Sequence, residues 1–420
     1  MTKSEIFDDV VSIMKNDSAT CRDIAGADPA PFRERISEDM SSGDFIDLVN
    51  EYLHSFGLTG HLEFYPSKQE IKFPPFASKR YNDRLYAITA HKDSVFQAGD
   101  CISELDGMTI PEAVEKYSRY FNEKNPDRQS REFDTLIRQK ISRVKVLHKA
   151  TGVEETVDLE FFPARDDSIK SNTFYLEKPA DDTALINLPD FLSRWPIENM
   201  IKENKRFLKK CRFIIFDVRG NRGGSDMNYY PFLKYVFPKG KNEYLFEDCG
   251  MDMLFTERNC KERIKAFEQS DTKGIEKFIK KEKENMGKGW VSGQDSFTTK
   301  IKGSKMPEKV FILTDERCGS SGDSFVSDMS VSPKVTVIGR RTSGITDYSN
   351  LVHVDYGDYS FYYPESRQRY LDKGIHYMGV GYPVDVEIPW TPEHFEHDAD
   401  LEKAMELIEN YRRGEHCCLE

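Results

Sequence analysis

Residues 310–326 have the sequence VFILTDERCGSSGDSFV, in which an apolar run leads into a Gly/Ser turn and a helix-forming stretch follows at once. The run Val310–Thr314 is typical of a buried strand. Backbone N–H groups at the start of a helix are unpaired and favour a developing oxyanion, which is the geometry that acyl transfer needs at Ser320. Ser320 also suits a helix cap, with Asp323 completing a capping-box pattern. This stretch alone leaves both interpretations open.

A second apolar run, Phe213–Val218, also ends in a turn, and residues 216–224 have the sequence FDVRGNRGG. Glycines let a backbone approach a ligand closely and present a bare N–H. An ordinary strand-to-helix turn is the alternative. A phosphate loop is excluded, because the chain has no GxxxxGK[ST] and this turn has no GxGxxG.

Strands and helices alternate along the second half of the chain. We expect strands at 184–190, 335–338 and 359–363, a helix over 195–210 and an amphipathic final helix over 399–411. Such alternation predicts an α/β sandwich with a mostly parallel central sheet. The charged residues from about 255 to 305 indicate helical excursions on the surface.

The first half has a different pattern. Apolar residues recur at helical spacing in 6–14 and 45–53, whereas short strand patterns follow from about 63 to 162. Residues 98–110, AGDCISELDGMTI, place an Asp-Gly turn between two short apolar runs, ahead of a helix. We therefore predict an N-terminal helical region over 1–66, a β-rich domain over 67–165 and an α/β domain over 166–420, with a polar linker near 165–171.

Composition limits the class of protein. Sixty Lys and Arg against 72 Asp and Glu give a formal charge of −12, which argues against binding to nucleic acid or to an anionic membrane. No apolar run is long enough to span a membrane. The eight cysteines form no CxxC pair and suit reduced thiols. The N-terminus lacks the apolar stretch of a signal peptide, so a cytoplasmic location is the expectation and an exported form stays open.

Taken together, the two turns resemble the tail-specific, or C-terminal processing, serine peptidase family. Residues 217–224, DVRGNRGG, match its "DxRxNxGG" strand end, and Ser320-Ser-Gly-Asp323 resembles its "SxxE" turn with Asp in place of Glu. Residues 337–344, VIGRRTSG, and 379–389, GVGYPVDVEIP, resemble two later family segments, and 98–107 resembles a PDZ-type "GDxIxxIdG". These pieces follow the family order over most of the chain. The resemblance implies an α/β peptidase domain of the ClpP/crotonase type behind a PDZ-like domain.

Carried onto this chain, the resemblance makes Ser320 the nucleophile. It places the oxyanion hole at the backbone N–H groups of Ser321 and of Gly223 or Gly224. Members with a Ser–Lys dyad have their lysine where this chain has Ile345. A tricorn-like branch uses a histidine from the N-terminal part instead, and Thr59-Gly60-His61 fits that place. The resemblance therefore implies His61 as the general base, a task that suits imidazole because its pKa lies near neutrality.

The third member of the charge relay is open. The tricorn-like branch keeps a glutamate shortly before its "GvxPD" segment, where this chain has Met378. Glu63, Glu365, Asp347 and Asp372 are possible substitutes. No metal or organic cofactor is required by this chemistry, and His394 and His397 lack a third metal ligand nearby. Peptides or proteins are the expected substrates.

Two other functions compete with a peptidase. The first is an esterase of the α/β-hydrolase type, although CGSSG around Ser320 keeps only the second glycine of GxSxG, with His376 or His397 as its base. The second is a peptide-binding protein on a decayed peptidase scaffold, which the missing lysine and glutamate would explain. A lone His61 is also compatible with a structural role.

Overall fold

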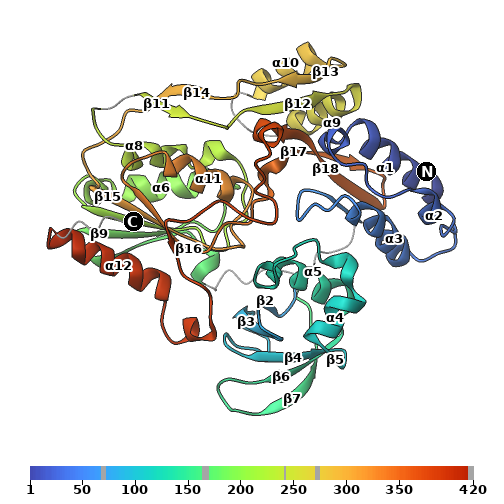
Figure 1. The fold of residues 1–420 in the computed structure, drawn as a ribbon, viewed down its shortest axis with the longest axis horizontal. Helices are drawn as coiled ribbons and strands as arrows, with labels where there is room; N and C mark the ends of the chain where they lie inside the picture. The colour runs from blue at the N-terminus through green and yellow to red at the C-terminus, as the bar shows by residue number, and fades with distance from the viewer. Residues whose placement is uncertain (68–71, 163–169, 241–242, 270–274, 415–420) are drawn as a thin grey trace. The chain divides into compact units, whose positions relative to one another are not determined.

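The structure is a computed structural model, and it describes residues 1–67, 72–162, 170–240, 243–269 and 275–414. The chain divides into two compact units, each assembled from segments that are far apart in sequence (Figure 1). Unit 1 comprises Met1–Glu70, Glu247–Phe297 and Ile345–Met378. Unit 2 comprises Ile71–Phe246, Thr298–Gly344 and Gly379–Glu420.

A six-stranded sheet forms the centre of unit 2, in the order β19-β16-β15-β10-β9-β8. All neighbours are parallel except the antiparallel pair β8 and β9. The mostly parallel sheet that strand–helix alternation predicts is confirmed. The strand bounds are β8 Tyr175–Ala180, β9 Thr183–Asn187, β10 Phe213–Asp217, β15 Lys309–Thr314, β16 Val335–Gly339 and β19 Val386–Glu387.

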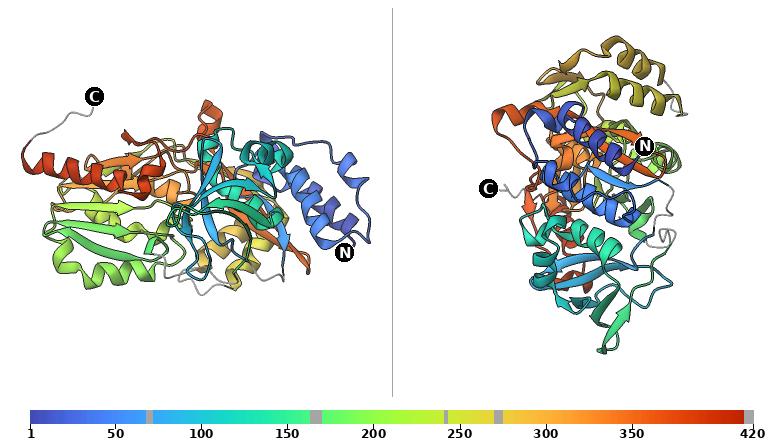
Figure 2. Two further views of the ribbon diagram at one scale, coloured as in Figure 1. Left: turned by 90° about the horizontal axis from the view of Figure 1, so that it is seen from below. Right: turned by 90° about the vertical axis from the view of Figure 1, so that its right-hand side faces the viewer.

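Helices cover both faces of this sheet, because successive residues of its buried strands point to opposite sides. From β10, Phe213 and Ile215 pack on one face with Leu407 of the final helix α12 (Ala399–Arg412). On the other face, the ring of Phe216 lies against Phe325 of α11 (Ser321–Ser330). Figure 2 shows α12 and the green helical segments on opposite sides of the sheet. Three further helices complete this part: α6 Trp195–Glu203, α7 Lys205–Leu208 and α8 Leu233–Val236.

Residues 72–162 of unit 2 form a second sheet with its own apolar core, called here the β2–β7 region. The strand order is β2-β3-β4-β6-β7, with β5 paired to β4. The predicted Asp-Gly turn joins β4 and β5, where Asp106 and Gly107 have φ of 49° and 78°. Its elements are β2 Phe76–Tyr81, β3 Arg84–Ala90, β4 Cys101–Leu105, β5 Met108–Thr109, α4 Ile110–Lys116, α5 Ser130–Lys140, β6 Arg143–Leu147 and β7 Glu154–Asp158.

Unit 1 is built on a five-stranded sheet in the order β1-β18-β12-β13, with β17 also paired to β18. The predicted strand at 359–363 belongs here, as part of the longer β18, and is antiparallel to its neighbours. The apolar faces of helices α1 and α3 pack on this sheet, as their sequence periodicity predicts. The bounds are α1 Lys3–Asn16, α2 Ala30–Arg33, α3 Ser42–His54, β1 Glu63–Pro66, β12 Met251–Phe255, β13 Gly289–Ser292, β17 Tyr348–Asp355 and β18 Tyr359–Gln368.

The charged stretch from about 255 to 305 contains two helices, α9 Glu257–Glu268 and α10 Ile275–Asn285. It also contains β13 and a short strand, β14 (Phe297–Lys300), which pairs with β11 (Glu243–Phe246). The predicted linker lies largely at 163–169, outside the described residues, as do Cys417 and Cys418. The predicted domain boundaries at 66/67 and 165/166 stay a prediction.

Candidate active site

Ser320 lies in the turn between β15 and α11, immediately before the first residue of the helix. Its backbone has φ 59° and ψ −122°, a conformation that residues with a side chain rarely adopt. A serine held in a strained strand-to-helix turn projects its hydroxyl away from the turn, as in hydrolases with a nucleophile elbow. The turn therefore presents the Ser320 hydroxyl beside the N-terminus of α11.

The glycine-rich turn after β10 lies against this serine. A methyl group placed on Gly223 would come within 2.6 Å of the Ser320 Cβ and 3.1 Å of its hydroxyl oxygen. A methyl group on Gly224 would come within 2.2 Å of the Phe191 backbone. Both glycines also have positive φ, 79° and 139°. The structure thus brings Ser320, Ser321, Gly223 and Gly224 together, and only glycine fits the second turn.

The backbone hydrogen bonds of the glycine turn indicate which N–H groups face Ser320. The Gly223 N–H donates to the side-chain oxygen of Asn221 at 2.8 Å. The Gly223 carbonyl accepts from the Phe191 N–H at 2.7 Å, and in a trans peptide the Gly224 N–H points the opposite way. None of the described residues accepts a hydrogen bond from the N–H groups of Gly224 and Ser321. The Ser321 hydroxyl donates to the Gly224 carbonyl at 2.9 Å and links the two turns.

Asp323 is fully buried beneath the serine turn and accepts from both sides of it. One carboxylate oxygen accepts from the Ser320 N–H at 2.8 Å, the other from the Gly344 N–H at 2.7 Å. Burial raises the Asp323 pKa to about 6, against hydrogen bonds from Thr342, Gly344 and Ser320 that lower it. The predicted contact of Asp323 with the Ser320 backbone is thus present, and it fixes the serine turn as well as capping the start of α11.

Two further polar residues hold the turns together, and the sequence analysis did not single them out. One carboxylate oxygen of Asp315 accepts from the N–H groups of Gly220, Arg317 and Cys318. The Asn221 side chain donates to the Leu188 carbonyl, and its backbone carbonyl accepts from the Gly319 N–H. The signal was present in the sequence: Asp315 directly follows the buried strand β15, and Asn221 lies inside the glycine-rich turn after β10.

Arg219 has a structural task in this motif. It forms ion pairs with Asp217, Asp398 and Asp400, and Asp400 also pairs with Arg340. Asp398 and Asp400 stand at the start of α12. These contacts dock the final helix against the end of β10.

His61 lies in unit 1, in the turn between α3 and β1, with φ 63°. Its Nδ1 is 2.7 Å from the backbone carbonyl oxygen of Tyr348. A methyl group on Gly60 would meet the Ile345 side chain at 3.1 Å, so the residue at the lysine position of the dyad members is a buried neighbour of the histidine turn. The pairing of Ser320 with His61 joins the two units and stays a prediction.

The four carboxylates that the sequence offered for the charge relay have other partners in unit 1. Glu63 accepts from the Tyr362 hydroxyl, and Asp372 pairs with Arg367. Asp347 accepts from the Tyr370 hydroxyl and from the backbone N–H groups of Tyr377 and Met378. Glu365 is buried, and one of its oxygens lies 3.2 Å from Nε of Arg263.

The remaining histidines of the sequence analysis lie elsewhere. His376 is exposed and its Nδ1 is 4.0 Å from an Asp347 oxygen. His397 pairs with Glu402, and His394 lies 3.8 Å from Asp400. Within the described part of the chain, no group of three or more His, Cys, Asp or Glu is placed to hold a metal ion. No described helix is long and apolar enough to cross a membrane.

Comparison with known proteins supports the family resemblance. Residues 182–376 match the model of peptidase family S41. No curated protein sequence matches the chain.

Among solved structures, mature CPAF complexed with lactacystin aligns over 97% of this chain and 98% of its own, with 12% identity and a TM-score of 0.67. Mature CPAF aligns over 97% and 96%, with 12% identity and a TM-score of 0.66. The photosystem II D1 C-terminal processing protease covers 94% of each chain at 13% identity and a TM-score of 0.48. The first two show a shared fold along nearly the whole chain. The resemblance read from the two turns is confirmed: residues 182–376, which contain both turns, match peptidase family S41, and the tail-specific serine peptidases are the family that this chain resembles.

Proposed function

We propose that the protein cleaves peptide bonds with Ser320 as nucleophile and His61 as general base, through an acyl-enzyme. The observation that carries this proposal is the Ser320 turn, where a strained serine meets two glycines that lack side chains. Acyl transfer needs an accessible nucleophile and N–H donors beside it. The turn offers the Ser320 hydroxyl as the nucleophile and the N–H groups of Ser321 and Gly224 as the donors.

The tautomer of His61 follows from its partner. A carbonyl oxygen only accepts, so an Nδ1 bonded to the Tyr348 carbonyl carries the ring proton. The Nε2 then carries no hydrogen and is able to accept the Ser320 hydroxyl proton. We propose that this carbonyl orients the imidazole, in the place where related enzymes use a carboxylate. A carbonyl dipole stabilises the imidazolium less than a full negative charge does, so we expect modest turnover.

The reaction then proceeds in two halves. The Ser320 oxygen attacks the peptide carbonyl as His61 takes its proton, and the resulting oxyanion accepts from the N–H groups of Ser321 and Gly224. Collapse breaks the C–N bond, and the imidazolium gives its proton to the leaving amine. Water attacks the ester in the second half, with His61 again accepting a proton, and releases the carboxylic acid and Ser320.

The three-part organisation completes the proposal. Residues 1–66 supply the general base, 67–165 form the PDZ-like part, and 166–420 carry the nucleophile and the oxyanion hole. The positions of the cuts in a substrate decide whether cleavage is internal or confined to the C-terminal end. We propose an endopeptidase, because the guanidinium of Arg317 on the Ser320 turn is paired with Asp134 rather than offered to a terminal carboxylate.

The test compares the wild type with Ser320→Ala and His61→Ala on a mixed peptide library, with products identified by mass spectrometry. We expect cleavage by the wild type, and a loss of about 10³-fold or more in each variant. His376→Ala is the matched control, since it removes an exposed histidine from the same unit. An activity that disappears with His376 but survives without His61 would favour the esterase alternative. Turnover retained in Ser320→Ala would refute the mechanism.

A covalent serine-directed probe separates an idle enzyme from a binding protein. Labelling of Ser320 without peptide cleavage indicates a reactive enzyme whose substrate is absent from the peptide library. No labelling and unchanged peptide affinity in Ser320→Ala would indicate a decayed scaffold.

A further inference from the structure

The β2 strand stands at the end of its sheet, with β3 on one side and helix α5 on the other (Figure 1). A peptide that is captured by strand addition pairs with the backbone N–H and C=O groups of such an edge strand. The bonding state of these groups on β2 therefore decides whether the β2–β7 region can take a substrate tail in this way.

Side chains already hold the backbone of Ser78 at the centre of this edge. Its N–H donates to a carboxylate oxygen of Asp134 on α5 at 2.8 Å. Its carbonyl oxygen accepts from the guanidinium of Arg317 at 3.2 Å, and Arg317 also forms an ion pair with Asp134. Arg317 belongs to the turn between β15 and Ser320, so the nucleophile turn itself closes the edge of β2.

Glu316, the residue before Arg317, is also bound to the β2–β7 region by side-chain contacts. Lys79 of β2 and Glu316 form a 2.7 Å ion pair in which each side chain is only 5% exposed. The same Glu316 oxygen accepts from the Ser130 hydroxyl at the start of α5. The Arg131 guanidinium donates to the Arg317 carbonyl. Burial would raise the Glu316 pKa, but the charges of Lys79 and Arg340 lower it, which keeps the Glu316 carboxylate ionised at neutral pH.

A second contact reaches the loop after β16. The Arg128 guanidinium donates to the carbonyls of Thr342 at 2.8 Å and Ser343 at 3.0 Å. The Ser343 N–H donates to the Cys318 carbonyl at 2.6 Å, and the next residue, Gly344, donates to Asp323. Arg128 therefore acts on the same Asp323 network that fixes the Ser320 backbone.

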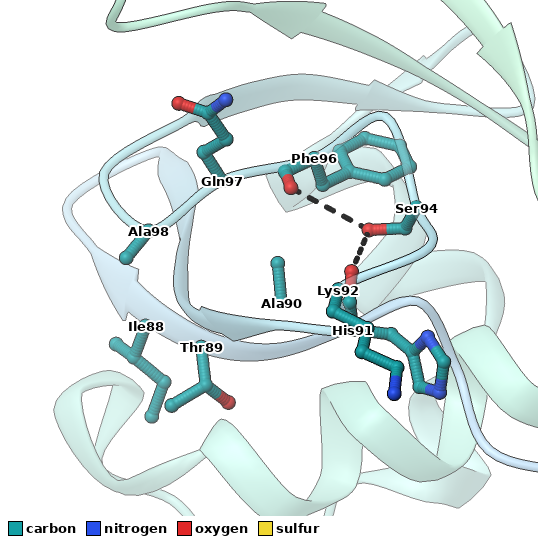
Figure 3. A pocket seen from close by; sticks show the side chains of 9 residues that line it. All are labelled: Ile88, Thr89, Ala90, His91, Lys92, Ser94, Phe96, Gln97 and Ala98. Carbon is teal, nitrogen blue, oxygen red and sulfur yellow. Dashed lines mark hydrogen bonds between the residues drawn. The ribbon is translucent and has the colours of Figure 1, made fainter. Parts of the chain in front are cut away.

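Two cavities lie in the β2–β7 region, and one of them reaches Arg317. One of about 230 Å³ lies between the start of β2 and α5, with Asp134, Arg138 and Arg317 in its wall. The other, shown in Figure 3, is lined by the β3–β4 loop and shares Thr89, Ala90 and His91 with the first. In that loop the Ser94 hydroxyl bonds to the His91 and Phe96 carbonyls, so its polar group is used within the loop (Figure 3). Of the two cavities, only the first has Arg317 and its partner Asp134 in its wall.

We propose that the β2–β7 region is a clamp for the nucleophile turn, with Arg317, Glu316 and Arg128 as positioning residues that set the backbone of Ser320, and that β2 does not take a substrate tail by strand addition while the clamp is closed. The clamp and an added strand need the same two groups of Ser78, so they exclude each other. The inference rests on the proposed role of Ser320, but the clamp itself can be measured without catalysis.

The test uses the full chain with Arg317→Gln. Removing the guanidinium frees the Ser78 carbonyl and unpairs Asp134, and the turn gains freedom. We expect a fall of about 10- to 100-fold in kcat and in the rate of Ser320 labelling by a serine-directed probe, with KM nearly unchanged. Hydrogen exchange of the backbone amides in 315–322 should become at least about tenfold faster. Arg317→Lys keeps the charge with fewer donors and should restore part of each loss.

Arg138→Gln is the matched control, because it removes the same charge from the wall of the same cavity and from the exposed side of α5. We expect it to leave kcat, labelling and amide exchange unchanged. Arg128→Gln provides an independent route through the second contact and should reproduce the exchange effect.

The outcomes divide cleanly. Unchanged exchange in both Arg317→Gln and Arg128→Gln overturns the clamp, as does a gain in activity, which would make Arg317 an inhibitory latch. If the wild type neither cleaves nor labels, the proposed function fails, and the exchange measurement still decides the clamp. A tail peptide that binds the wild type and protects the β2 amides would overturn the exclusion of strand addition.

Discussion

At the scale of single residues, the site depends on the absence of side chains at Gly223 and Gly224 as much as on the side chains that are present. The sequence predicts Ser320, Ser321, Gly223 and Gly224 as one site, and the structure brings these four together. It does not reveal which glycine offers its N–H, because that depends on the Asn221 side chain, which takes the Gly223 donor. A motif specifies residue types, whereas donor directions come from folded backbone.

Gly223→Ala tests the close approach of the two turns. The added methyl group would lie 2.6 Å from the Ser320 Cβ, against backbone that cannot move aside easily. We expect Ser320 labelling and peptide cleavage to fall by more than about 100-fold. Gly220→Ala is the control: its φ is also positive, at 67°, but nothing lies within 4 Å of the added methyl group. That control should lose about 1 kcal/mol of stability and keep most of its activity. Equal losses in both variants would mean that backbone strain alone explains the effect.

Asp323→Asn tests the carboxylate beneath the serine turn. Both of its oxygens accept backbone N–H groups, and an amide would set its NH₂ against one of these donors. We expect a loss of roughly 1–3 kcal/mol in the free energy of unfolding, measured in urea, and slower labelling of Ser320. Asp328→Asn is the control on the same helix, where a carboxylate accepts from the Tyr229 hydroxyl. Labelling at the wild-type rate in Asp323→Asn would show that Asp323 has no influence on the turn.

The Asp323 carboxyl also predicts a pH dependence. Its pKa is raised to about 6 from 3.8, so the folded chain binds a proton that the unfolded chain releases between these values. Its contribution to stability therefore falls as pH rises from about 4 to 6 and is constant above that range. The slope of unfolding free energy against pH across this window should shrink in Asp323→Asn.

At the scale of elements, strand 359–363 shows where local patterns mislead. Its apolar residues predict a strand, which is confirmed, but its alternation with helices suggested the central sheet. Only three residues separate β17 from β18, and such a short connection joins antiparallel strands, not parallel ones. The connection length was readable in the sequence and outweighs the pattern of alternation. The helix expected over 195–210 is likewise interrupted, since α6 ends at Glu203 and α7 begins at Lys205.

Glu365 in β18 predicts a second pH effect. Burial raises its pKa to about 8, and neither of its oxygens has a hydrogen-bond partner among the described residues. Arg263 of α9 and Lys281 of α10 lower the pKa, whereas Glu282 of α10 raises it further. The folded chain thus holds a proton on Glu365 that the unfolded chain loses above about 4.5, and stability falls as pH rises from about 4.5 to 8.

Glu365→Gln removes this titration and keeps the size of the side chain. We expect the variant to be more stable than the wild type at pH 9, by roughly 2–4 kcal/mol, and similar to it near pH 4.5. Urea unfolding at both pH values provides the measurement. Glu284→Gln, an exposed carboxyl on α10, should change neither. A variant that follows the wild-type pH profile would show that Glu365 is ionised in the folded chain.

At the scale of the whole molecule, residues that are far apart in the sequence contact one another. Lys79 and Glu316 are 237 residues apart, and Arg128 and Thr342 are 214 apart. Hydrophobic periodicity is local information, so it predicts elements but not these pairs. The family order of motifs predicts the fold class, yet it does not predict that the β2–β7 region and the nucleophile turn belong to one compact unit.

Asp400→Ala tests the docking of the final helix. Burial alone would raise the Asp400 pKa, but the nearby His394 and the charges of Arg340 and Arg219 lower it below its usual range. Such an ionised group stabilises the fold above about pH 4, and this contribution is lost as pH falls below that value. Removing it leaves two guanidinium groups without their shared partner, at a cost of about 3–5 kcal/mol. Thermal unfolding at pH 7 and pH 3.5 checks both the size and the pH dependence.

Glu402→Ala serves as its control, because Glu402 lies on the same helix and pairs with His397 at an exposed site. An exposed pair contributes at most about 1 kcal/mol. Equal effects of the two substitutions would mean that the arginines find other partners.

The cavity beside Arg317 has a consequence for pharmacology. An anionic compound seated in this space of about 230 Å³ would compete with Asp134 for the guanidinium and loosen the clamp. It would slow acylation without entering the place where the scissile bond lies, so raising the substrate concentration would not relieve the inhibition. Screening for compounds that lower the maximal rate and leave KM unchanged would find such allosteric inhibitors, and they need not resemble a peptide.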